Sequence, residues 1–150
     1  MKIKSAEWVV VFDGGKALLL QNAGDDLYPN LQTREVQEHA NPKASEQGSD
    51  RPGRVHESAN AGRSSMEQTD WHEQNERRFI ADLADHLDKA VRTARISQVI
   101  VVAPPHALGV LREHTSDAVK GAVKAELAKD YVKKPIHEIE TLLASIEARG

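Results

Sequence analysis

Two short, uninterrupted apolar segments restrict the folds open to this 150-residue chain more than any other feature of its sequence. Residues 8–12 read Trp-Val-Val-Val-Phe, and residues 99–102 read Val-Ile-Val-Val. Runs of β-branched residues without polar alternation are typical of strands that are covered on both faces. Such strands belong to sheets with helices on both sides, so the sequence predicts an α/β fold.

Three further segments predict strands. The turn sequence Asp13-Gly14-Gly15 allows positive φ angles, so residues 7–12 and 16–20 are expected to form a β-hairpin. Residues 31–38 alternate less cleanly and predict a third strand at an edge of the sheet. Residues 123–128 alternate apolar and charged side chains but also fit helical spacing. We expect a helix from about Ser116 that passes into a strand there.

The other predicted elements are helices. A long helix is expected from Trp71 to Ala94, with Asp70 as its N-cap and Glu73 completing a capping box. Its apolar stripe should face the core and contains Phe79, Leu83, Leu87 and Val91. Two shorter helices are expected at residues 107–114 and 135–148. Together the elements predict one three-layer α/β domain over residues 1–150, a mixed sheet of about five strands with helices on both faces.

The segment from His39 to Asp70 has no apolar periodicity, and structureless loops of this length usually serve a function or act as linkers. Arginine side chains in and after it are candidates for RNA or phosphate contacts: Arg51, Arg54, Arg63, Arg77 and Arg78. Internal ion pairs with neighbouring carboxylates are an equally good interpretation. The residues expected to order the loop are Asp50, Asp70, Trp71 and His72. Trp71 either packs against the core or forms an exposed contact, and we favour packing.

Composition limits the classes of partner. The formal net charge is −3, so any RNA contact must be a local patch, and no DNA partner is expected. The absence of cysteine excludes disulfides and thiol nucleophiles and suits a reducing compartment. No apolar run approaches the length of a membrane span or of a signal-peptide core, so we expect a cytoplasmic protein without a membrane partner.

The sequence gives less support to a catalytic site than to a binding loop. Asp13 follows the first predicted strand, where a divergent RNase H-like hydrolase would hold a metal ion. Two-metal chemistry needs several converging carboxylates, however, and a turn role for Asp13 is favoured. The histidines and carboxylates near residues 56–57 and 70–73 match no metal-ligand spacing. We therefore predict no catalytic residue, metal or cofactor, with Asp13 as the alternative.

Several motifs together resemble one bacterial family. They are Trp8-Val9-Val10-Val11-x-Asp13-Gly14-Gly15-Lys16-Ala17, Asn41-Pro42, Gly48-Ser49-Asp50-Arg51-Pro52-Gly53-Arg54, Thr69-Asp70-Trp71-His72-Glu73, Arg78-Phe79, Val102-Ala103-Pro104-Pro105 and Leu108-Gly109-x-Leu111-Arg112. The family is the host-attachment family, known as "protein required for attachment to host cells". The resemblance extends over nearly the whole chain.

That family is in turn similar to the bacterial release-factor-like group and to the middle domain of archaeo-eukaryotic class-1 release factors. The resemblance implies an RNase H-like fold with a long loop after the third strand. In release factors this loop carries the Gly-Gly-Gln triplet. The nearest match here is Ala61-Gly62-Arg63, and an arginine has no carbonyl to replace the glutamine amide. The resemblance therefore implies a non-catalytic protein that contacts the ribosome or tRNA and affects host attachment indirectly.

Overall fold

The computed structural model describes residues 1–38 and 61–146, and for residues 61–70 it describes the helical backbone alone. Five strands and four helices lie in these ranges. In chain order they are β1 (Trp8–Phe12), β2 (Lys16–Asn22), β3 (Leu31–Glu38), α2 (Ala61–Arg92), β4 (Val99–Ala103), α3 (Pro105–His114), α4 (Asp117–Ala122), β5 (Val123–Ala128) and α5 (Ile136–Ser145).

The five strands form one mixed sheet in the order β3-β2-β1-β4-β5. β1 pairs antiparallel with β2 and parallel with β4. β2 pairs antiparallel with β3, and β4 pairs parallel with β5. The two apolar runs that predicted buried strands are therefore the neighbouring central strands β1 and β4. The predicted hairpin, the edge position of the third strand and the mixed five-stranded sheet are confirmed.

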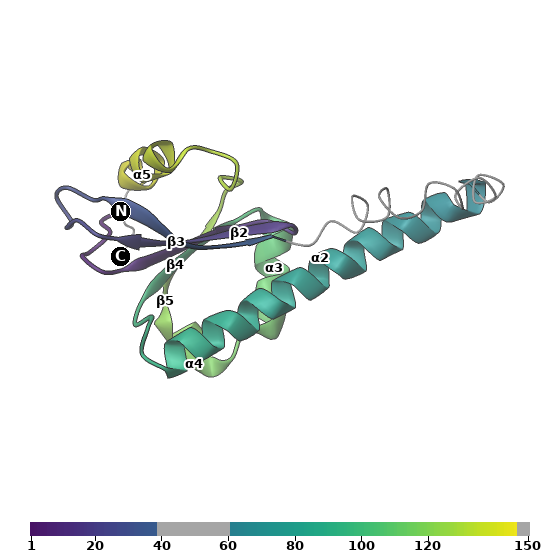
Figure 1. The fold of residues 1–150 in the computed structure, drawn as a ribbon, viewed down its shortest axis with the longest axis horizontal. Helices are drawn as coiled ribbons and strands as arrows, with labels where there is room; N and C mark the ends of the chain where they lie inside the picture. The colour runs from purple at the N-terminus through teal and green to yellow at the C-terminus, as the bar shows by residue number, and fades with distance from the viewer. Residues whose placement is uncertain (39–60, 147–150) are drawn as a thin grey trace.

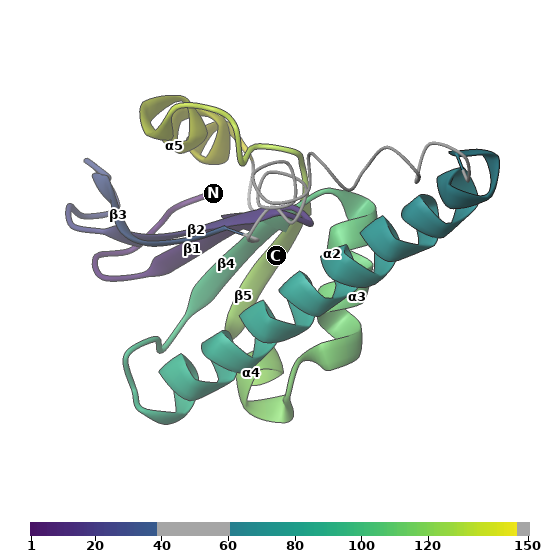
Figure 2. The same cartoon turned by 45° about the vertical axis from the view of Figure 1, so that its right-hand side comes forward.

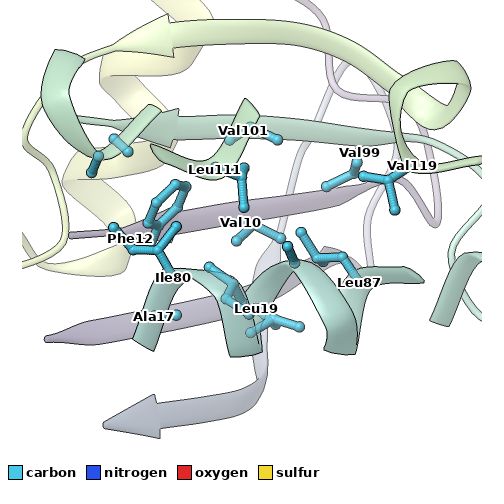
Figure 3. Close-up of a cluster of buried hydrophobic side chains, with 14 of the residues drawn as sticks. Val10, Phe12, Ala17, Leu19, Ile80, Leu87, Val99, Val101, Leu111 and Val119 are labelled. Carbon is cyan, nitrogen blue, oxygen red and sulfur yellow. The ribbon is translucent and has the colours of Figure 1, made fainter. Parts of the chain in front are cut away.

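Helices cover both faces of the sheet (Figures 1 and 2). Helices α2, α3 and α4 lie on one face, where Val10, Phe12 and Leu19 of the sheet pack against Ile80 and Leu87 (Figure 3). Helix α5 covers the other face and buries Ile139 and Leu143 against a second cluster. Alternate residues of β1 enter the two cores, which explains why the strand has no polar face.

Helix α2 begins ten residues earlier than predicted. The capping box predicted a start at Trp71 with Asp70 as N-cap, and this prediction is wrong, because Asp70 is the tenth residue of a helix that starts at Ala61. Residues 61–70 contain no proline and only one glycine, so nothing in the backbone prevents the helix from continuing upstream. Part of the predicted loop, including Arg63, is therefore helical.

The other predicted boundaries are close. Helix α3 begins at Pro105 rather than Ala107, because proline is well suited to the first helical position. Helix α4 is capped by Ser116, whose Oγ accepts from the Val119 amide at 3.2 Å, and it passes directly into β5 as expected. Helix α5 extends from Ile136 to Ser145, within the predicted range.

Candidate functional site

Helix α2 is much longer than the sheet that it covers. Its 32 residues span about 48 Å, whereas the longest strand, of eight residues, spans about 27 Å. Its buried side chains occur only between Phe79 and Ala90 among residues 71–92. The amino-terminal part of the helix consequently extends beyond the core as an arm (Figure 1). We call residues 61–78 the projecting half of α2 and residues 79–92 the packed half.

The charged side chains on the inner side of the projecting half contact the rest of the protein. Arg77 donates from Nη1 to Glu113 of α3 at 2.9 Å, and its Nε lies 3.4 Å from Glu73. Glu73 also lies 3.2 Å from Nε2 of His106, near the start of α3. The side chain of Glu76 lies so close to Gly14 that a Cβ there would approach it to 2.8 Å. Both carboxylates are thus directed toward the domain.

The opposite side of the same segment is open to solvent. Trp71, Gln74, Asn75 and Arg78 are spaced i, i+3, i+4 and i+7, so they share one side of the helix, which we call the outer face of α2. The side chain of Trp71 is 46% exposed, so the predicted packing of this residue against the core is wrong. Gln74 and Arg78 are also exposed, and Asn75 is half-buried. An aromatic ring, two amides and a guanidinium therefore face solvent together.

The predicted phosphate-binding arginines do not form one group in the described residues. Arg51 and Arg54 lie outside these residues, as does Asp50. Arg63 is on α2, at a position where the structure describes the backbone alone. Arg77 points toward α3, whereas Arg78 is exposed on the outer face. Of the residues expected to order the loop, Trp71 and His72 are exposed on α2.

Asp13 has a structural part in the β1–β2 turn. Its Oδ1 accepts hydrogen bonds from the backbone amides of Gly15 at 2.8 Å and Lys16 at 2.9 Å, an arrangement that fixes a tight turn. The turn is closed by the Asp13 amide, which donates to the Lys16 carbonyl at 2.9 Å. Within residues 1–38 and 71–146, no group of three or more histidines and carboxylates has the arrangement of a metal site.

A charged cluster that the sequence did not reveal joins β3 to the packed half of α2. Oε2 of Glu35 on β3 lies 2.9 Å from Nε2 of His86, and Arg95, after the helix, donates to the same carboxylate. The Arg95 guanidinium also stacks over the ring of Trp8, 5.7 Å from its centroid. Burial raises the pKa of Glu35, but the hydrogen bond from Arg95 and the charges of His86 and Arg95 outweigh burial and lower it.

This cluster has no counterpart in a local motif. Its residues lie far apart along the chain, and only the fold brings them together. Glu35 is half-buried on an edge strand whose residues, apart from Leu31 and Gln37, are otherwise exposed. This burial is known only from the structure, so the sequence itself carried no signal for the cluster. The cluster ties the outermost strand to the helix and so fixes where the packed half lies.

These features define an α/β protein built on a five-stranded mixed sheet, with a long helix, α2, that extends past the sheet. No helix in the described part of the chain has the length and apolar character needed to cross a bilayer. A family model described as "Protein required for attachment to host cells" matches residues 8–143. The chain belongs to this host-attachment family, as its motifs predicted. No curated protein matches it.

Proposed function

We propose that this protein is a non-catalytic, cytoplasmic binding protein that contacts RNA, on the ribosome or in tRNA, through the projecting half of α2 and the arginine-bearing segment before it. The outer face of α2 is the observation that carries this proposal. Under it, any effect on host attachment is indirect and follows from the RNA contact.

The chemistry of the outer face suits an unpaired RNA strand. An exposed indole provides a surface on which bases of any kind can stack, worth about 1–3 kcal/mol per base. Amide side chains can donate to and accept from base edges, and a guanidinium can bind a phosphate through two parallel hydrogen bonds. Trp71, Gln74 and Arg78 supply these three chemistries along two turns of helix.

The distribution of carboxylates supports the same proposal. Glu73 and Glu76 would repel phosphate, but both are directed toward the domain, onto His106 and Gly14. Among residues 71–92, where the structure describes the side chains of α2, exposed acids on the outer side occur only farther along the helix, at Asp82 and Asp85. The stretch from Trp71 to Arg78 is therefore a short window without an outward carboxylate, next to the segment that contains the other arginines.

The resemblance to release factors gives a reason for an RNA partner. Three strands, an intervening segment, a long helix and a central strand follow in the order expected for the RNase H-like middle domain. The proposed Gly-Gly-Gln position falls at residues 61–63, at the far end of the projecting half. The helix would hold residues 61–63 away from the core, which would allow this end to reach into a cleft of its RNA partner. Arg63 in place of glutamine supports binding without peptide release.

Co-sedimentation with purified ribosomes tests the proposal at the outer face. We expect the Trp71→Ala, Arg78→Ala double variant to bind at least tenfold more weakly than the parent. The matched control is Val36→Ala, Arg92→Ala, because Val36 is similarly exposed, at 49%, and Arg92 is an exposed arginine of the same helix. Equal binding by the two double variants would contradict a role for the outer face.

A second comparison tests the arginine-bearing segment. The variant Arg51→Ala, Arg54→Ala, Arg63→Ala should lose affinity, and its binding should depend less steeply on salt, by roughly 0.7 per lost phosphate contact in a log–log plot. The control, Lys2→Ala, Arg34→Ala, Lys133→Ala, removes the same number of positive charges elsewhere and should keep the parental slope. If both variants lose the same amount, net charge rather than this segment determines binding. If the parent fails to sediment with ribosomes or bind tRNA, the RNA proposal is wrong.

A further inference from the structure

The loop between β2 and β3 is held in one conformation by a buried asparagine. Nδ2 of Asn22 donates to the carbonyls of Ile3, Lys4 and Asp25, and its Oδ1 accepts from the amides of Gly24 and Asn30. Oδ1 of Asp25 in turn accepts from the amides of Leu27 and Tyr28. These bonds fix the backbone from both ends of the loop, so the loop is preorganised.

This ordered loop presents two large apolar side chains to solvent. Leu27 is 72% exposed and Tyr28 is 80% exposed, and both exceed every other large apolar side chain among the described residues. Exposed Asp25 and Asp26 come immediately before them. A rigid turn that displays a tyrosine loses little conformational entropy on binding, and tyrosine is common at the energetic centres of interfaces. The loop could therefore bind a partner through its apolar side chains, with two acidic residues beside them.

A complementary depression lies between α3, α4 and β5. This cavity of about 350 Å³ is lined by Leu111, Arg112, Thr115, Lys120, Val123 and Glu126. Arg112 pairs with Glu126 at 2.7 Å, which leaves Lys120 as the cation that pairs with no carboxylate in the described part of the chain. The depression thus combines apolar side chains with a positive rim, the reverse of the acid-flanked loop. Its volume is at the small end for a ligand site and suits one inserted side chain.

The loop and the depression are at opposite edges of the sheet. The loop joins β2 to the edge strand β3, and the depression adjoins β5, the other edge strand. Four strand spacings of about 4.8 Å separate these edges by roughly 19 Å, so a chain cannot insert its own loop into its own depression. We propose that they bind between copies: Tyr28 of one copy inserts into the depression of the next, and Asp26 lies near Lys120.

This contact is head-to-tail, because the two surfaces are different. Each copy that binds a neighbour through its loop still offers an empty depression, so assembly continues beyond a dimer unless the contacts close into a ring. Analytical ultracentrifugation of the purified chain should show a weight-average mass that rises with concentration above 16.5 kDa. A mass that stays at one chain up to the solubility limit would overturn the proposal.

Single-surface variants give a sharper test. Tyr28→Ala should weaken self-association about tenfold or more, as loss of an aromatic anchor does, while Trp71→Ala, also an exposed aromatic, should leave it unchanged. Mixing Tyr28→Ala with Lys120→Glu leaves one intact loop and one intact depression in each pair, so the mixture should stop at twice the mass of one chain. If Tyr28→Ala and Trp71→Ala weaken association equally, the loop is not the contact.

A charge exchange tests the proposed orientation. Asp26→Lys and Lys120→Glu should each associate more weakly than the parent, because like charges then face each other. An equimolar mixture of the two should recover association, since every contact in an alternating assembly again joins opposite charges. If the mixture stays as weak as its components, Asp26 does not face Lys120. Circular dichroism checks that these exposed substitutions leave the fold intact.

Discussion

The two halves of α2 are one continuous helix, yet they differ in what holds them. The packed half buries Phe79, Ile80, Leu83, Leu87 and Ala90 against the sheet. In the projecting half, residues 71–78 bury no side chain. Their contacts to α3, Arg77 with Glu113 and Glu73 with His106, join side chains that are all substantially exposed. The difference shows that a helix can be held by core packing at one end and remain exposed to solvent at the other, since helical hydrogen bonds continue across the boundary.

The largest effect is expected from deleting a side chain in the packed half. Leu87 is fully buried between the helix and the sheet, so Leu87→Ala should lower the free energy of unfolding by about 2–5 kcal/mol. Trp71→Ala removes a larger side chain from the projecting half and should change it by less than about 0.5 kcal/mol. Urea unfolding measures both. A loss at Trp71 comparable to that at Leu87 would show that the halves are not distinct.

The next effect concerns the cluster that ties β3 to the packed half. Glu35→Gln should lower the free energy of unfolding by about 1 kcal/mol at pH 7, because Arg95 and His86 lose their charged partner. The pKa of Glu35 is lower folded than unfolded, so its stabilisation is present above the ordinary value of 4.5 and is lost as pH falls through the folded pKa. The difference between variant and parent should therefore shrink on acidification.

The neighbouring Glu38→Gln is the matched control for this prediction, because Glu38 is exposed on the same strand. It should have little effect at either pH. If the stability difference for Glu35→Gln were unchanged at a pH well below 4.5, the ionised carboxylate would not be the stabilising group.

A smaller, stabilising effect is expected at the end of the packed half. Ala94 has φ = 62°, a left-handed conformation that glycine adopts more easily. The amide of Ala94 donates to the Val91 carbonyl and that of Arg95 to the Ala90 carbonyl, the pair of bonds that usually surrounds a glycine. Ala94→Gly should raise the free energy of unfolding by about 0.5 kcal/mol, the relief of strain exceeding the entropy cost of glycine. A lower thermal midpoint for this variant would contradict the assignment.

The contrast between packed and projecting regions also explains which parts of the structure could be predicted from the sequence. The strands of the central sheet and the packed half of α2 were predictable, because burial imposes a pattern on each: two-sided in β1 and β4, and a stripe from Phe79 to Ala90. The start of α2 was not, because residues that face no core carry no such pattern. Asp70 and Glu73 have the spacing of a capping box, which marks a helix start, although both lie within the longer helix.

The candidate site was predictable only in part. Arg78 was identified as a candidate for RNA or phosphate contact, whereas Trp71 was expected to pack against the core. The outer face that joins them depends on knowing that the helix continues past the sheet. The cluster of Glu35, His86 and Arg95 depends on contacts 51 and 60 positions apart in sequence, which no local pattern records. The family was recognisable because its motifs are local strings, and the match over residues 8–143 confirms it.

The smallest effect tests the boundary between the halves. Arg77→Ala removes the contacts to Glu73 and Glu113, both substantially exposed, so the free energy of unfolding should fall by less than about 0.5 kcal/mol. Its effect should be local instead: amide hydrogen exchange should accelerate at Trp71–Arg78 and stay unchanged from Ile80 to Ala90. Arg92→Ala, which breaks a pair with Asp88 within the packed half, should not accelerate exchange at Trp71–Arg78. Faster exchange throughout α2 in the Arg77→Ala variant would mean that the helix opens as one unit. The projecting half would then depend on the core as directly as the packed half does.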